Sequence, residues 1–116
     1  MPGPYADYWI STPNKVLSTT EAQIATFEAP NVVVGMVGLL QVQVQTENTN
    51  GLKAVIKVNH KNVFTYGPSS TNLGRVLQAV VPTGTFKVGQ NTIEGEVLTG
   101  SGSLNVNSIA IWWQAS

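Results

Sequence analysis

The sequence predicts an all-β domain, folded as an antiparallel β-sandwich of the jelly-roll type. Apolar residues recur at every second position far more often than at helical spacing, and β-branched residues are frequent. About seven to nine short runs of this kind follow one another, with polar turns between them. The 116 residues suffice for one hydrophobic core and are too few for two domains.

We expect an N-terminal arm over residues 1–17 and a single β-sandwich domain over residues 18–116. The arm contains two prolines and the aromatic residues Tyr5, Tyr8 and Trp9. Such an arm would pack over a neighbouring subunit or cover an edge of its own sheet.

The first strands of the domain alternate between apolar and polar residues. A helix-capping pattern precedes residues 24–29. The β-branched and aromatic side chains of 24–29 nevertheless favour a strand over a helix. The clearest strand covers 39–46, where leucine and valine alternate with glutamine. The next covers 52–59, and the Asn-Gly pair before it predicts a hairpin turn over 47–51.

Turn residues divide the second half of the chain in the same way. We expect turns at 59–62 and 100–103, and a loop at 67–74 that is rich in glycine, proline and serine. The remaining strands are expected at 63–66, 75–82, 91–98 and 104–113.

Two adjacent tryptophans, Trp112 and Trp113, point to opposite faces of the last strand, so only one can enter the core. The apolar residues of this strand change from even to odd positions, which a β-bulge near Asn107 and Ser108 would explain. That phase places Trp113 in the core. Trp112 is then either covered by a loop or the N-terminal segment, or offers a flat ring to a sugar or a subunit interface.

Composition excludes several classes of partner. Six basic residues balance six acidic ones, so no basic field exists to attract nucleic acid or anionic membrane surfaces. The chain contains no cysteine and no apolar run of about 18 residues that would span a membrane. No signal peptide is visible, so we expect a cytoplasmic protein or a chain whose leader has been removed.

The residues give little support to catalysis. Glu94 and Glu96 are close enough to act as an acid and base pair, but such a pair is more often a solvated strand face, here opposite Lys53 or Lys57. His60 is the only histidine, and no nucleophile can be paired with it from the sequence. A single aspartate makes a hard-cation site improbable. We therefore expect no enzyme, no metal and no cofactor.

The segment 86–114 combines a Lys-x-Gly-x-Asn-x-Ile stretch, a Gly/Ser turn and a terminal aromatic residue. These features are Lys87, Gly89, Asn91, Ile93, residues 100–103 and Trp113. In this it resembles the galactose-binding-like β-sandwiches of carbohydrate-binding modules and of polysaccharide lyase accessory domains. The segment 55–66 is similar to their middle hairpin. The resemblance implies the sandwich fold and a carbohydrate ligand; Asn107 and Ser108 replace a frequent acidic residue, so no calcium site is implied.

A weakly charged surface rich in asparagine, glutamine, serine and threonine suits neutral sugars, especially beside an aromatic ring. We expect a non-catalytic, lectin-like module whose partner is a glycan or polysaccharide. The candidate sugar-binding residues are Trp112, Gln114, Asn59, His60, Asn62, Tyr66 and Asn72. For the asparagines in turns, ordinary turn geometry is the simpler explanation.

The alternative is a structural or self-assembling protein, such as a homo-oligomer subunit or an appendage domain. It rests on a strand face of Gln41, Gln43 and Gln45, on the unexplained Trp112, and on the aromatic arm. Zero net charge favours association. The two functions are compatible, because weak sugar sites gain avidity on an oligomer.

Overall fold

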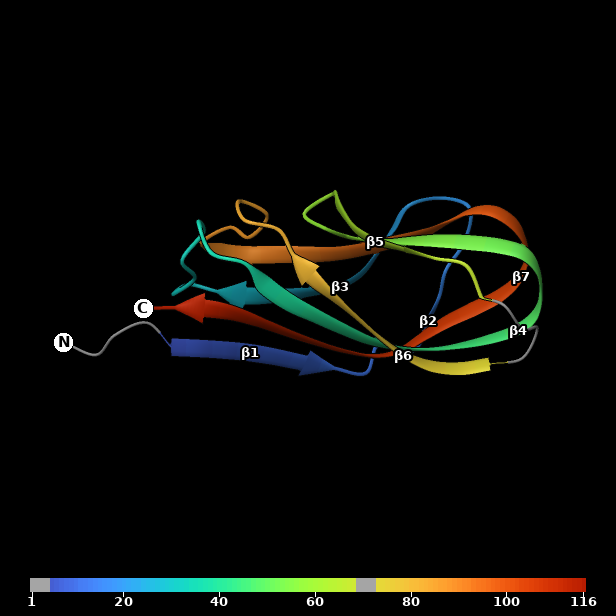
Figure 1. The fold of residues 1–116 in the computed structure, drawn as a ribbon, viewed down its shortest axis with the longest axis horizontal. Coiled ribbons are helices and arrows are strands. Elements are labelled where there is room, and N and C mark those ends of the chain that lie inside the picture. The colour runs from blue at the N-terminus through green and yellow to red at the C-terminus, as the bar shows by residue number, and fades with distance from the viewer. Residues whose placement is uncertain (1–4, 69–72) are drawn as a thin grey trace.

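The computed structural model describes residues 5–68 and 73–116, which form seven strands joined by antiparallel pairing (Figure 1). No helix in these residues is long and apolar enough to cross a membrane. The strands are β1 (Tyr5–Ser11), β2 (Lys15–Val16), β3 (Ala22–Ala29), β4 (Gly38–Val58), β5 (Lys61–Tyr66), β6 (Leu73–Val81) and β7 (Gly89–Ala115).

Two long strands, β4 and β7, pair with each other and bend together from one layer of the molecule into the other (Figure 1). The N-terminal part of β4 pairs with the C-terminal part of β7, and β1 and β6 flank this pair. We call this the first sheet. The C-terminal part of β4 pairs with the N-terminal part of β7, and with β3 and β5 on either side they form the second sheet. The predicted antiparallel sandwich of jelly-roll type is confirmed.

The bend replaces two turns that the sequence predicts, so the expected hairpin at 47–51 and the turn at 100–103 are both wrong. The runs on either side of 47–51 do not pair with each other, because both pair with β7. Asn48 and Gly51 adopt left-handed conformations, with φ of 52° and 62°. Facing them, Gly100 and Gly102 have φ of 81° and 106°. Turn-forming residues therefore bend both strands without reversing either.

Other predicted elements are confirmed. The strand at 24–29 lies in β3, and β6 ends directly before Pro82. The turn expected at 59–62 is present but shorter: it is formed by Asn59 and His60, whose φ values are 51° and 66°, and β5 begins at Lys61. Residues 5–11, part of the expected N-terminal arm, form β1 and pair with the end of β7.

The predicted β-bulge lies at Asn107, because Gln43 pairs with Ser108 while the next residue, Val44, pairs with Val106. The skipped residue changes the phase of β7, so apolar side chains before and after it enter the same core. Trp113 follows this phase inward and is only 3% exposed, as predicted.

Aromatic rings fill the core between the two sheets near the C-terminus. Phe27 stacks on Trp113 with ring centres 5.5 Å apart and on Trp9 at 5.8 Å, and it meets the edge of Phe86 at 6.3 Å. The indole nitrogen of Trp113 donates a hydrogen bond of 3.0 Å to Asn31 Oδ1. Trp113 therefore combines apolar burial with a satisfied polar group, which accounts for one of the two tryptophans.

The bend depends on close contact between the backbones of β4 and β7. A Cβ added at Gly100 would lie 2.3 Å from the carbonyl carbon of Gly51, besides occupying a left-handed conformation. We expect Gly100→Ala to lower the free energy of unfolding by about 3 kcal/mol or more in urea titrations. Gly35→Ala is the control, since nothing lies within 4 Å of the added Cβ. Equal stability of the two variants would contradict this account of the bend.

Candidate functional site

The structure divides the predicted sugar-binding residues into two groups on different sheets. Trp112 and Gln114 lie near the end of β7, in the first sheet. Asn59, His60, Asn62 and Tyr66 belong to the β4–β5 hairpin of the second sheet. Asn72 lies outside the described residues. The two groups are best considered separately.

The outward side chains of the first sheet form rows that run across its paired strands. One row consists of Tyr8, Trp112, Leu39 and Val80, and the next of Ile10, Ala110, Gln41 and Gln78. Ser108, Gln43 and Val76 form a third row on β7, β4 and β6. We call these eleven positions, together with Ala6 and Gln114, the platform face.

None of the side chains at the platform positions carries a charge. Gln78 donates a hydrogen bond of 2.7 Å to Gln41 across the strands, and the Ser108 hydroxyl donates one of 3.2 Å to Gln43. The face therefore combines an apolar row around Trp112 with a neighbouring band of amides. This is the surface chemistry of a neutral partner that has both C–H and hydroxyl groups.

Trp112 borders a hollow of about 230 Å³ at this face. The hollow is lined by Ala6, Val37, Gly38, Leu39, Val80, Trp112, Trp113 and Gln114. Trp112 itself is half-buried, as is Gln114. The structure thus brings Trp112 and Gln114 together beside a mostly apolar depression.

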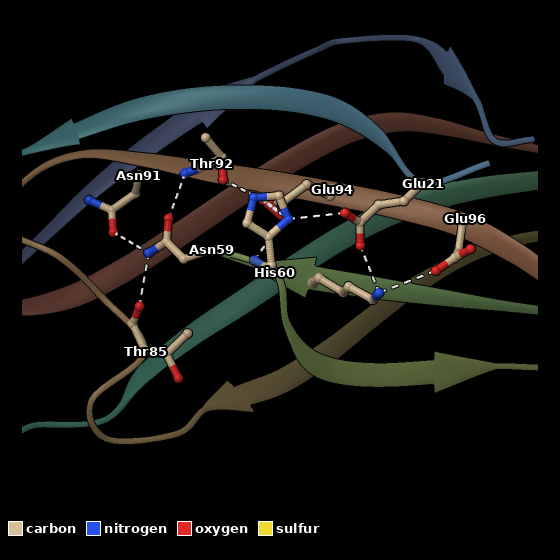
Figure 2. Close-up of polar contacts among 9 residues, drawn as sticks. Glu21, Asn59, His60, Thr85, Asn91, Thr92, Glu94 and Glu96 are labelled. Atoms are coloured by element: carbon tan, nitrogen blue, oxygen red, sulfur yellow. Dashed lines mark hydrogen bonds and ion pairs between the residues drawn. The ribbon is translucent and has the colours of Figure 1, made fainter.

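In the second group, Asn59 is committed to internal hydrogen bonds (Figure 2). Its side-chain nitrogen donates to the carbonyl of Thr85 and to Asn91 Oδ1, both at 2.8 Å, and its oxygen accepts from the Thr92 amide at 2.9 Å. Asn91 is fully buried and also closes the loop between Lys87 and Gly89. Asn59 therefore fixes loop geometry and keeps no polar atom for a ligand.

Charged residues beside the hairpin form an ion-pair network across the second sheet (Figure 2). Lys57 Nζ lies 2.7 Å from Glu21 Oε1 and 3.2 Å from Glu96 Oε1. Hydrogen bonds from Lys57 and then from His60 lower the pKa of Glu21 below its ordinary value. Hydrogen bonds to Glu21 and Glu96 raise the pKa of Lys57. Of the two lysines expected opposite the glutamate pair, Lys57 thus contacts Glu96.

Glu94 is not on a solvated face, contrary to the expectation for the pair Glu94 and Glu96. It is 2% exposed, because the His60 turn covers it and donates a backbone hydrogen bond of 3.0 Å to its Oε2. Thr92 donates a further hydrogen bond to Glu94 Oε1. Within residues 5–68 and 73–116, no group of three or more potential metal ligands is arranged around a common point.

The rest of the hairpin lies apart from the platform face. The His60 side chain is mostly exposed, and its Nδ1 is 3.0 Å from Glu21 Oε2. Asn62 is exposed. Tyr66 is half-buried against the core, and its hydroxyl has no hydrogen-bond partner in the described structure. The hairpin is therefore held by structural contacts, in contrast to the open platform around Trp112.

Sequence reasoning missed most of the residues that surround Trp112. Tyr8, Leu39 and Val80 come from three strands, and only the pairing of those strands places them in one row. The outward phase of each strand was readable from its alternation, but the strand order was not.

Comparisons of the whole chain support the fold. Neither protein-family models nor curated sequences gave a match. Among solved structures, dimeric latent PorU from Porphyromonas gingivalis matches with a TM-score of 0.72 and 13% identity over 97% of this chain. The chain spans 13% of that protein.

Two smaller structures match over nearly their whole lengths. The CBM36-1 domain of a multidomain xylanase from the hindgut metagenome of Trinervitermes trinervoides has a TM-score of 0.57 and 17% identity, covering 90% of this chain and 96% of that one. A Bacillus endospore appendage protein, which forms disulfide-linked pili, has a TM-score of 0.53 and 12% identity, covering 97% and 89%. At such low sequence identities the likeness concerns the fold alone. It confirms that the fold resembles the β-sandwich of carbohydrate-binding modules.

The role of Asn59 predicts a large difference between neighbouring asparagines. Asn59→Ala removes three internal hydrogen bonds and should lower the free energy of unfolding by about 3 kcal/mol. Asn62→Ala, at an exposed site without a side-chain hydrogen bond in the described residues, should change it by about 0.5 kcal/mol or less. Chemical denaturation measures both, and similar losses would refute a structural role specific to Asn59.

The lowered pKa of Glu21 predicts how stability depends on pH. A carboxyl group whose pKa is lower in the folded state stabilises that state at pH values above its ordinary pKa of 4.5. This contribution is lost as the pH falls through the folded-state pKa. Glu21→Gln should therefore be less stable than the parent near neutral pH, and the difference should shrink below pH 4.5. Thermal unfolding across this range tests the effect; a difference that stays constant would contradict it.

Proposed function

We propose that this protein is a non-catalytic carbohydrate-binding module that holds neutral glycans on the platform face of its first sheet. The observation that carries the proposal is the half-buried Trp112 beside a hollow, in a face whose positions carry no charged side chain. An aromatic ring contacts the C–H face of a sugar, while nearby amides exchange hydrogen bonds with its hydroxyls.

The roles of the residues follow from their places on this face. Trp112 is the stacking platform, and Tyr8 extends the aromatic row on β1. Gln114 lines the hollow beside Trp112. Gln41 and Gln78 supply amides one row away. The fold shared with the CBM36-1 domain of a xylanase supports this class of ligand.

A second candidate function is self-assembly through the same face. Tyr8, Ile10 and Val80 are each 59% exposed and Val76 is 57% exposed, which is unusual for an uncharged sheet surface in a monomer. The fold shared with the subunit of an endospore pilus favours this alternative. In that case Trp112 would lie in a contact between copies, and the glycan would be absent or secondary.

The test is a screen of the purified protein and its Trp112→Ala variant against immobilised glycans and polysaccharides of plant, bacterial and fungal origin. We expect selective binding of neutral glycans by the parent. The variant should lose about tenfold or more in affinity, because it loses the stacking surface, while its cooperative unfolding persists.

Leu98→Ala is the matched control, since Leu98 is an exposed apolar residue on the part of β7 that lies in the second sheet. It should bind like the parent. Light scattering during gel filtration gives the mass of all three proteins. If the folded parent binds no glycan, and Trp112→Ala lowers the mass of an assembled parent, the self-assembly function replaces the carbohydrate proposal.

A further inference from the structure

A second hollow, of about 390 Å³, lies on the outer side of the first sheet near the bend. Its lining differs from that of the Trp112 hollow. Of the six described residues that line it, one is the apolar Val16 and five are polar, namely Asn14, Gln45, Glu47, Ser103 and Asn105. They come from the β1–β2 segment, from β4 and from β7. Of the predicted sugar-binding residues that the structure describes, none lines this hollow.

The polar groups around this hollow are largely uncommitted. Among the described residues, Asn14, Gln45, Glu47 and Ser103 have no side-chain hydrogen bond, and Asn105 bonds only to Asn107. The Oδ1 atom of Asn105 is buried without a partner. This contrasts with Asn59 and Asn91 of the second sheet, whose side chains are held by internal hydrogen bonds.

The chemistry of the lining selects one class of ligand. Amides and a hydroxyl both donate and accept hydrogen bonds, and the Glu47 carboxylate accepts bonds from hydroxyl groups. Val16, which is 54% exposed, offers an aliphatic contact for C–H groups. The carboxylate disfavours an anion, and none of the described lining residues is a cation that would offset it. A neutral, polyhydroxylated molecule fits these groups.

The two hollows lie on the same side of the first sheet. Gln45 and Leu39 point outward from β4, six residues apart, between the buried side chains of Leu40, Val42 and Val44. At about 3.3 Å per residue, their positions are about 20 Å apart along the strand. The outward amide Gln43 and its row lie between them. One monosaccharide cannot reach both hollows, but an extended oligosaccharide can.

We propose that the hollow around Gln45, Glu47 and Asn105 is a second saccharide subsite, so that the ligand of the platform face is a neutral, extended glycan chain. This inference rests on the proposed carbohydrate function. It adds that binding strength depends on chain length, and that Glu47 excludes acidic glycans from the far end of the face.

The experiment measures affinity by calorimetry for neutral oligosaccharides of increasing length, taken from the polysaccharide that binds best in the screen. For the parent, affinity should rise with length until one chain reaches both hollows. The Gln45→Ala, Asn105→Ala double variant should bind the longest chains about tenfold more weakly, because it loses hydrogen bonds there, and bind the disaccharide unchanged. Gln90→Ala, an exposed glutamine of the second sheet, is the matched control.

Glu47→Gln gives a second readout that does not depend on removing contacts. It should bind uronic-acid oligosaccharides severalfold more tightly than the parent and neutral chains about equally. The second subsite would be overturned if the affinity of the double variant rose with chain length as in the parent. It would also be overturned if Glu47→Gln discriminated between neutral and uronic-acid chains as the parent does. If Trp112→Ala still abolishes binding in that case, the proposed function stands. Absence of glycan binding by the parent would remove both proposals.

Discussion

The pairing of β4 with β7 is the contact on which the rest of the sandwich depends. These strands form the centre of both sheets, and every other strand hydrogen-bonds to one of them. Their common bend carries the chain from one layer to the other, and it requires left-handed residues in both strands at the same level. The core side chains of the two layers then face each other, because the Asn107 bulge keeps the apolar phase of β7 directed inward.

The same arrangement explains why the two faces of the molecule differ. On the second sheet, the β4–β5 turn and the segment before β3 fold over the outer surface, where Glu21, Lys57 and Glu94 form ion pairs and hydrogen bonds. On the first sheet, no described segment closes over the Trp112 hollow to the same degree, and Tyr8, Ile10 and Val80 stay exposed. Polar residues with satisfied hydrogen bonds therefore stabilise the outer surface of the second sheet. On the first sheet, the ring of Trp112 and the amides of Gln114 and Gln45, which bond to no other described side chain, are available for recognition.

Much of the fold followed from alternation in the sequence, including the bulge and the inward position of Trp113. The bend did not, because Asn-Gly and Gly/Ser segments have the same local conformations in a tight hairpin and in a bent strand. Only long-range pairing decides between them. The same limit applied to the candidate site: Trp112 was identifiable as the outward tryptophan, but its neighbours depend on strand order. Conversely, Asn59 looked available for a ligand because its partners, Thr85 and Asn91, are distant in sequence.

Glycan binding on the first sheet can be observed residue by residue by following the indole and backbone N–H signals of the protein by NMR during titration with the best-binding neutral oligosaccharide. Binding on the first sheet should cause large shifts of the Trp112 indole signal and of the amide signals of Leu39 and Gln41. It should cause little change at the Trp113 indole, which is hydrogen-bonded to Asn31, or in the turn at Asn59 and His60. Shifts confined to that turn, with the Trp112 signal unmoved, would contradict binding on the first sheet.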